Sequence, residues 1–262
     1  MIFAVCTIFP PLLPAFCSFG VLGKAVEKGI IRVETIDPRD FTHDRHKTTD
    51  DRPFGGGSGM VMKPEPLQAA IRQAKQMLPE APVILLGPQG RVFTQAMARR
   101  LAAGPGCILV CGRYEGVDER VLQTCVDEEI SVGDYVLSGG EPAALVVMDA
   151  VARLVPGVLG NAGSPETESF EDGLLEHGHY TRPRVFEDEP VPEVLLNGHH
   201  KDIATWREET ALLRTLVRRL DLLEKEELTG RQIAILKDWG RRIDTIVSSQ
   251  SVPGPAAPSG DE

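Results

Sequence analysis

Three short glycine-containing loops could together bind a small molecule. Each follows an apolar run of the kind that forms a buried strand: residues 87–90 follow 83–86, residues 112–116 follow 108–111, and residues 138–141 follow 130–137. In open α/β sheets, ligands bind at the carboxyl ends of the strands, where glycine lets the backbone approach closely. The pattern therefore predicts one site built by three loops. The alternative is that these glycines only close turns between strands and helices.

Other motifs that carry chemistry are incomplete. No loop has the GxGxxG pattern that follows a strand in dinucleotide-binding folds, so that fold is not indicated. The FGGGSG run at residues 54–59 lacks the Gly-Lys-Ser/Thr ending of a phosphate-binding loop, which favours a flexible hinge. His177, His179, His199 and His200 have no cysteine partners at metal-binding spacing. We interpret these histidines as structural or surface residues and assign no metal ligand.

An alternation of strands and helices positions the three loops. Strands are expected at residues 2–8, 30–36, 83–86, 107–111 and 130–136, and helical segments at 11–28, 67–78, 94–103, 117–125 and 142–154. This order predicts an α/β fold with a mostly parallel sheet and helices on both faces. The polar, glycine-rich segment 41–59 is expected to be a long loop.

The chain is predicted to contain two domains. The α/β domain spans residues 1–160, and the acidic, non-periodic residues 161–172 are predicted to be a flexible linker. Residues 173–247 carry apolar positions at helical spacing and a capping-box pattern at 229–232, which predicts a small all-α domain. Residues 248–262 are predicted to be a disordered tail.

Composition bounds the kind of protein. With 42% hydrophobic and 25% charged residues, the chain is typical of globular proteins. Prolines interrupt the apolar N-terminus and no run approaches the ~20 residues of a membrane span, so we expect a cytoplasmic protein with no membrane partner. The five cysteines form no CxxC pair and are expected to be free thiols. The net charge of −10 disfavours a nucleic-acid partner, but residues 1–160 carry 16 basic and 18 acidic residues (16 − 18 = −2), leaving room for basic faces.

Several strings resemble those of one enzyme family. CGRYEGVDER at residues 111–120 and SVGDYVLSGGE at 131–141 are similar to the cofactor loops of the bacterial tRNA (guanine-N1)-methyltransferases of the TrmD type, which belong to the SPOUT superfamily of knotted methyltransferases. Further similar strings follow in order: PRDFTHDRH (38–46), DDRPFGGGSGM (50–60), VPGVLG (155–160), HYTRP (179–183) and LLNGHH (195–200). The resemblance implies a trefoil-knotted sheet, which periodicity could not predict because knots are nearly absent from folds.

The resemblance also implies a cofactor, S-adenosylmethionine, and a homodimer whose active sites use both chains. By resemblance, the cofactor contacts are Leu86, Gly87, Pro88, Gly112, Glu115, Val132, Gly133, Asp134, Tyr135, Val136, Leu137, Gly139 and Gly140. Some family members use magnesium, which Glu115 could hold, although the sequence shows no metal-ligand spacing.

Arg153 and Glu168 are the acid–base candidates that the resemblance implies. Methylation of guanine N1 needs a base for the N1 proton and a stabiliser for the negative charge on O6, roles suited to a carboxylate and an arginine. The family's arginine precedes PGVLG by three positions, which is Arg153. The family's aspartate precedes a phenylalanine by two, where this chain has Glu168, one methylene longer; Glu171 and Asp172 are nearby substitutes. Alternatively, Arg153 caps its helix and the acids are merely solvated.

Two polar and basic segments are expected to contact the anticodon stem-loop of tRNA. They contribute His46, Asp50, Arg52, Gly57, Tyr180, Arg182 and Arg184. Phosphate contacts would fix the register of the RNA, and a flipped target base would confer identity. Each residue taken singly is equally an ordinary surface group.

The predicted function is methyl transfer from S-adenosylmethionine to N1 of the guanosine immediately 3′ of the anticodon, position 37 of tRNA. One alternative is another knotted RNA methyltransferase that acts on a ribose hydroxyl or a ribosomal base. The HYTRP string and the helical second domain argue against it. A second alternative is a non-catalytic tRNA-binding factor, which would fit a glutamate at position 168.

Overall fold

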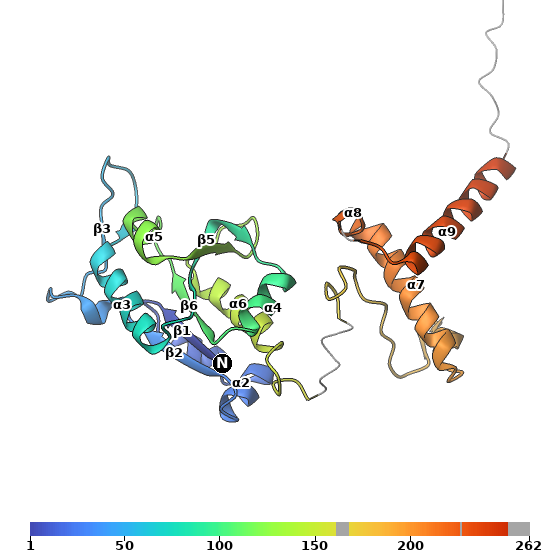
Figure 1. Cartoon of the computed structure of the whole chain (residues 1–262), viewed down its shortest axis with the longest axis horizontal. Coiled ribbons are helices and arrows are strands. Elements are labelled where there is room, and N and C mark those ends of the chain that lie inside the picture. Colours follow the sequence, from blue (N-terminus) through green and yellow to red (C-terminus); the bar gives the residue numbers. More distant parts are fainter. Residues whose placement is uncertain (161–167, 226, 251–262) are drawn as a thin grey trace, which may run out of the picture. The chain divides into compact units, whose positions relative to one another are not determined.

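The computed structural model describes residues 1–160, 168–225 and 227–250. It divides the chain into two compact units, Met1–Pro165 and Glu166–Glu262. The first unit contains the predicted sheet, and the second contains the C-terminal helices (Figure 1).

The first unit is built around a five-stranded sheet in the order β2-β1-β6-β5-β7. Its strands are β1 (Ile2–Cys6), β2 (Arg32–Ile36), β5 (Val83–Val92), β6 (Gly106–Cys111) and β7 (Glu128–Ser131). All neighbouring strands run parallel. The mostly parallel α/β sheet predicted from the sequence is therefore confirmed.

Helices cover both faces of this sheet (Figure 1). One face packs against α1 (Leu12–Phe16), α2 (Gly20–Glu27), α4 (Gln95–Ala102) and α6 (Glu141–Ala152), and the other against α3 (Pro64–Met77) and α5 (Glu119–Cys125). Side chains alternate between the two cores, as the period of a strand requires. On β6, Leu109 belongs to the first core, whereas Ile108 and Val110 belong to the second.

The segment expected to be a long loop contains a small antiparallel pair. The 3-10 helix η1 (Pro38–Phe41) precedes it, and β3 (Asp50–Asp51) pairs with β4 (Val61–Met62). Met62 N–H donates to the carbonyl of Gly116 at 3.0 Å, and Asp118 N–H donates to the carbonyl of Met62 at 3.2 Å. The hairpin is thus attached to the loop that follows β6.

The second unit is mainly helical, as predicted. It contains α7 (His200–Arg218), α8 (Leu220–Lys225) and α9 (Gly230–Ser249), together with an unpredicted hairpin of β8 (Val185–Phe186) and β9 (Glu189–Pro190) and the 3-10 helix η3 (Glu193–Leu195). The predicted capping box is present, with Thr229 and Gln232 each bonding the other's backbone. Among the described residues of this unit, only Leu212 and Thr215 are buried, so much of its apolar surface is exposed.

One predicted strand boundary was wrong, whereas the expected linker and tail stay predictions. β7 ends at Ser131 instead of residue 136, because Gly133 has a φ of 139° and turns the chain out of the sheet. α9 continues through Ser249, two residues into the expected tail, whose residues 251–262 lie outside the described part. Of the expected linker, residues 161–167 also lie outside it, but Glu171 N–H donates to the Glu168 carbonyl at 3.2 Å, so the remainder begins as a hydrogen-bonded turn.

The cysteines are thiols that form no disulfide among the described residues. All five cysteines are free, four of them buried, as predicted. No helix among the described residues is long and apolar enough to cross a membrane.

Candidate functional site

A cavity of about 300 Å³ lies beside residues 85–89 of β5 and at the carboxyl ends of β6 and β7. The three loops predicted from the sequence meet there. The predicted contacts that line it are Leu86, Gly87, Pro88, Gly112, Glu115, Val132, Gly133, Tyr135, Val136, Leu137, Gly139 and Gly140. Asp134 is exposed and is not among the lining residues. Arg113, Tyr114, Gln89, Glu129 and Ser131 also line the cavity and were not singled out in the sequence.

Two of the loops touch through their backbones. Gly140 N–H donates to the carbonyl of Gly112 at 2.8 Å. A Cβ atom at Gly140 would lie 2.7 Å from Cα of Cys111, closer than real Cβ contacts come. Glycine at 140 is therefore required by the close approach of the loop to the end of β6, and the interpretation of these glycines as simple turn residues does not account for it.

The first loop is a bulge within a strand. Leu86 and Arg91 both lie opposite Ile130, so residues 87–90 bulge out of the ladder between β5 and β7. A Cβ atom at Gly90 would lie 2.4 Å from the backbone nitrogen of Ile130. The sequence correctly predicted a loop after residue 86. It missed that the strand resumes beyond the loop and continues to Val92.

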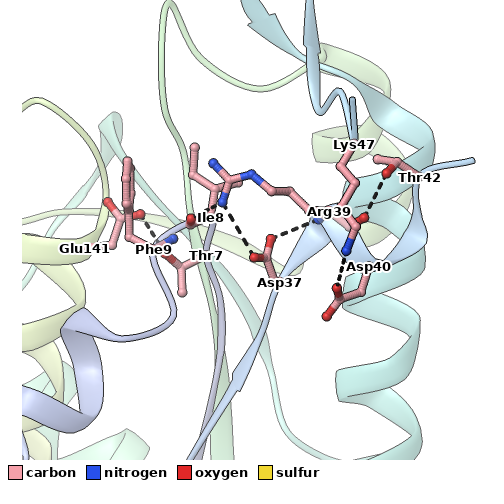
Figure 2. Close-up of polar contacts among 9 residues, drawn as sticks. All are labelled: Thr7, Ile8, Phe9, Asp37, Arg39, Asp40, Thr42, Lys47 and Glu141. Carbon is pink, nitrogen blue, oxygen red and sulfur yellow. Dashed lines mark hydrogen bonds and ion pairs between the residues drawn. The ribbon is translucent and has the colours of Figure 1, made fainter. Parts of the chain in front are cut away.

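A buried carboxylate lies behind the cavity. Glu141, the first residue of α6, is completely buried, and its Oε1 accepts a hydrogen bond from Thr7 Oγ1 at 2.7 Å. Its Oε2 accepts a hydrogen bond from Arg113 Nε at 2.8 Å. Arg113 Nη1 donates in turn to the carbonyl of Ser138 at 2.9 Å, and its guanidinium lies 4.5 Å from the centre of the Phe9 ring. The contacts of Glu141 with Thr7, and of Thr7 with Phe9, are drawn in Figure 2.

The same end of β1 also holds the segment that follows β2. Arg39 donates a hydrogen bond to the carbonyl of Ile8 and lies 3.5 Å from a carboxylate oxygen of Asp37 (Figure 2). Lys47 Nζ lies 3.4 Å from Asp40 Oδ1. Residues Thr7 to Phe9 are thus a junction between the cavity loops and the segment that carries the predicted RNA contacts.

The cavity is surrounded by groups with shifted pKa values. Burial, followed by the negative charge of Glu119, raises the pKa of the Glu129 carboxyl above its usual range, although a hydrogen bond from the Gln89 backbone opposes this. Burial and then the charge and hydrogen bonding of Asp50 raise the pKa of Tyr114. Burial, followed by the charge of Glu141, raises the pKa of the Cys111 thiol well above its ordinary value. The ionisable side chains that line the cavity include the carboxyl groups of Glu115, Glu119 and Glu129 and the guanidinium of Arg113.

The predicted RNA contacts are divided between the two units. In the first unit, His46, Arg52 and Gly57 are exposed, and Asp50 is half-buried beside Tyr114 of the cavity. In the second unit, Tyr180 is 53% exposed, and Arg182 and Arg184 are exposed next to the β8–β9 hairpin. The ring of Tyr180 lies 6.1 Å from the ring of the half-buried Trp206, a contact that the sequence did not reveal.

The acid–base candidates are also divided between the units. Arg153 is the C-cap residue of α6, and its backbone N–H donates to the carbonyl of Asp149 at 3.2 Å. Glu168 is half-buried and begins the turn closed by Glu171. Arg153 therefore belongs to the first unit and Glu168 to the second.

No metal centre is apparent within the part of the chain that the structure describes, where no three His, Cys, Asp or Glu side chains gather. Glu115, the magnesium candidate, lies against Gly59, where an added Cβ would come within 2.3 Å of its carboxylate oxygen. Its N–H donates to the carbonyl of Met60 at 2.9 Å, which ties this loop to the hairpin.

These features define an α/β protein with a parallel sheet and a cavity lined by the three glycine-containing loops. A family model described as tRNA (Guanine-1)-methyltransferase TrmD matches residues 1–225. A tRNA (guanine-N(1)-)-methyltransferase from Desulfatibacillum aliphaticivorans is 55% identical over 257 residues, which cover 98% of each chain. One from Marinomonas sp. (strain MWYL1) is 52% identical over 247 residues, 94% of this chain and 99% of that protein. The chain therefore belongs to the tRNA (guanine-1)-methyltransferase family, and the resemblance found in the sequence is confirmed.

Proposed function

We propose that this protein transfers the methyl group of S-adenosylmethionine to N1 of the guanosine at position 37 of tRNA. The observation that carries the proposal is the cavity, because the loops that resemble the family's cofactor loops meet around it. Its volume of about 300 Å³ lies at the lower end of the range for small-molecule sites. Glycine backbones at its rim suit the neutral adenosine, and Glu115 and Glu129 suit the positive charge of the cofactor.

The chain's own residues would carry out the proton chemistry. The cofactor, when bound, supplies an electrophilic methyl group on a sulfonium. Glu168 would accept the proton of guanine N1, and Arg153 would stabilise the negative charge that develops on O6. The exposed residues His46, Arg52 and Arg182 would hold the RNA backbone, because arginine and histidine side chains donate to phosphate oxygens.

A homodimer with composite sites is part of the proposal. Arg153 follows the last turn of α6, whereas Gly140, which lines the cavity, precedes its first turn. A helix rises 1.5 Å per residue, so these two ends are about 18–20 Å apart. An arginine at that distance favours a site in which the cofactor cavity of one chain meets Arg153 of a second copy. The exposed apolar surface of the second unit is consistent with such a partner.

Each unit would have its own role in this reaction. The α/β unit would bind the cofactor, the residues around 161–172 would link it to the helical unit, and the helical unit would bind the anticodon stem-loop. Glu115 is the side chain that would hold magnesium if the reaction uses it. With a tRNA substrate, the activity would lie in the cytoplasm.

The test is the identity of the methylated nucleoside. The full-length protein is incubated with S-adenosylmethionine and a tRNA carrying G37, and the RNA is digested to nucleosides. N1-methylguanosine is expected, and a matched transcript with A37 should stay unmethylated. A ribose-methylated nucleoside would identify another knotted RNA methyltransferase. No methylated product, with tRNA binding retained, would favour the non-catalytic factor.

A further inference from the structure

Glu141 is the only charged side chain that is buried among the described residues. A buried carboxylate is costly, because it loses its hydration, and it must be matched by good partners. Each carboxylate oxygen of Glu141 accepts a hydrogen bond: Thr7 Oγ1 donates to Oε1 at 2.7 Å, and Arg113 Nε donates to Oε2 at 2.8 Å. Since apolar packing usually stabilises a fold as well as a buried ion pair does, stability alone is a weak reason for this arrangement.

The arginine that Glu141 holds belongs to the cavity. Arg113 lines the cavity, and its Nη1 donates to the carbonyl of Ser138 at 2.9 Å. Its side chain lies across Gly139, where an added Cβ would come within 2.2 Å of Nε. Arg113 therefore fastens the loop after β6 to the loop before α6, and both loops line the cavity.

Thr7 and Glu141 contact the cavity only through Arg113 and its neighbours. Neither is among the residues that line it. Thr7 lies just after β1, and its hydroxyl also accepts a hydrogen bond from the N–H of Phe9 at 2.9 Å. The Phe9 ring faces the guanidinium of Arg113 at 4.5 Å, so the end of β1 supports both members of the pair.

We propose that Glu141 is a positioning residue for the cofactor cavity. Its carboxylate, oriented by the hydroxyl of Thr7, holds Arg113 in the rotamer that joins the two loops. The inference rests on the proposed function, because the cavity is taken to bind S-adenosylmethionine. It assigns roles to two residues that would touch neither the cofactor nor the RNA.

A matched pair of substitutions at Thr7 tests the hydroxyl. Thr7→Val keeps the shape but removes the donor to Glu141, whereas Thr7→Ser keeps the donor and removes a methyl group. Isothermal calorimetry on full-length protein should give a Kd for S-adenosylmethionine about three- to tenfold higher for Thr7→Val and nearly unchanged for Thr7→Ser. The Kd for tRNA without cofactor should be unchanged in both variants.

A second pair separates positioning from stability. Glu141→Gln should raise the cofactor Kd by about 10- to 100-fold, since a misplacement of about 1 Å can cost that much in a site. Val151→Ala, in the buried core face of the same helix, should lower the melting temperature but leave the cofactor Kd near wild type. If Glu141→Gln does not fold, the Thr7 pair decides the question.

The outcomes are distinct. Wild-type Kd values in folded Glu141→Gln or in Thr7→Val would overturn the positioning role, as would equal losses in Thr7→Val and Thr7→Ser. An equal rise of the cofactor Kd in Val151→Ala would show a general loss of stability and would also overturn it. If the wild-type protein itself bound no S-adenosylmethionine at millimolar ligand, the proposed function would fail, and this inference with it.

Discussion

Glu141 and Arg153 mark the two ends of α6: Glu141 is its first residue and Arg153 is its C-cap. Arg153 follows Glu141 by twelve positions along the helix, which corresponds to about 18 Å. Glu141 holds the loops of the cavity from behind, so Arg153 lies a full helix length from that cavity within one chain. Because of this separation, cofactor binding and the contribution of Arg153 to methyl transfer can be tested independently.

Substitution of Arg153 should affect chemistry and leave the cofactor in place. We expect Arg153→Ala to bind S-adenosylmethionine with nearly the wild-type Kd, because the residue is remote from the cavity of its own chain. Its single-turnover methylation rate should fall by about 10²–10³, the usual effect of losing a stabiliser of a developing oxyanion. Rapid-quench assays measure this rate. Wild-type turnover would mean that Arg153 only caps its helix.

Two inactive variants should complement each other if the active sites are composite. Gly140→Val should destroy the cavity of its own chain, and Arg153→Ala should remove the arginine of the other. In mixed dimers, one of the two sites would then combine an intact cavity with an intact arginine. Co-expressed and randomly paired, the two chains should show about a quarter of wild-type activity. If no activity returns although mixed dimers form, each site is built within one chain.

Gly140→Ala alone should weaken cofactor binding. Its backbone conformation is open to any residue, with φ of −76° and ψ of −14°, so the cause would be the collision of the new Cβ with Cα of Cys111 at 2.7 Å. We expect the Kd for S-adenosylmethionine to rise by at least about tenfold, because the loop must move away from its partner loop. Gly104→Ala is the control, since a Cβ there meets only an ordinary contact at 3.4 Å.

Glu168 is expected to be the general base. Glu168→Gln should slow the single-turnover reaction by about 10²–10⁴, since an amide cannot accept the proton. Glu168→Asp should retain substantial activity because it keeps the carboxylate. Glu171→Gln and Asp172→Asn are controls expected to change the rate only slightly. A fast Glu168→Gln enzyme beside an inactive Glu171 or Asp172 variant would transfer the role to that neighbour.

Four of the cysteines should resist alkylation in the folded protein. Burial raises the pKa of Cys6 to about 12 and that of Cys17 to about 11. Burial, and then the charge of Glu128, raises the pKa of Cys107 to about 12. Iodoacetamide at pH 8 should modify only the half-buried Cys125, and all five thiols after unfolding in urea, as peptide mass spectrometry can show. Labelling of Cys111 in the folded protein would reveal that the cavity loops open.

The same pKa shifts predict a loss of stability at high pH. Unfolded thiols ionise from their ordinary pKa of 9.0, whereas Cys6 keeps its proton to about 12 in the folded state. The folded state therefore binds more protons between these values, and the free energy of unfolding must fall as pH rises through this window. Cys6→Ala should reduce that decline, which urea titrations at pH 8 and pH 10 would measure.

Sequence periodicity was sufficient for the centre of the sheet, because β1, β6 and the first half of β5 are runs of buried, mostly apolar residues. It failed at β7, where Val132, Tyr135 and Val136 continue the apolar pattern although Val136 is 97% exposed. The apolar character of this loop comes from its place at the rim of the cavity, and a pattern of hydrophobicity cannot distinguish a rim from a core. The glycine at 133, which turns the chain, was the available signal.

The cavity loops were predictable, but the buried pair behind them was not. Glu141 and Arg113 lie 28 positions apart and Thr7 lies 134 positions from Glu141, so no local spacing joins them. A carboxylate in the first turn of a helix is ordinarily exposed. There its negative charge interacts favourably with the partial positive charge at the helix N-terminus. Glu141 is nevertheless fully buried, next to Gly140, whose backbone approaches Cys111 closely.

The strand order has a consequence for how the nascent chain folds on the ribosome. β1 pairs on one side with β2 and on the other with β6, so that Ile2 lies opposite both Arg32 and Gly106. β2 follows β1 closely, but the chain between Ile36 and Gly106 must be synthesised before β6 can arrive. At about 5–20 residues per second, that takes several seconds. During this interval an apolar strand edge stays open to other chains, so protection by chaperones should matter most before β6 has emerged.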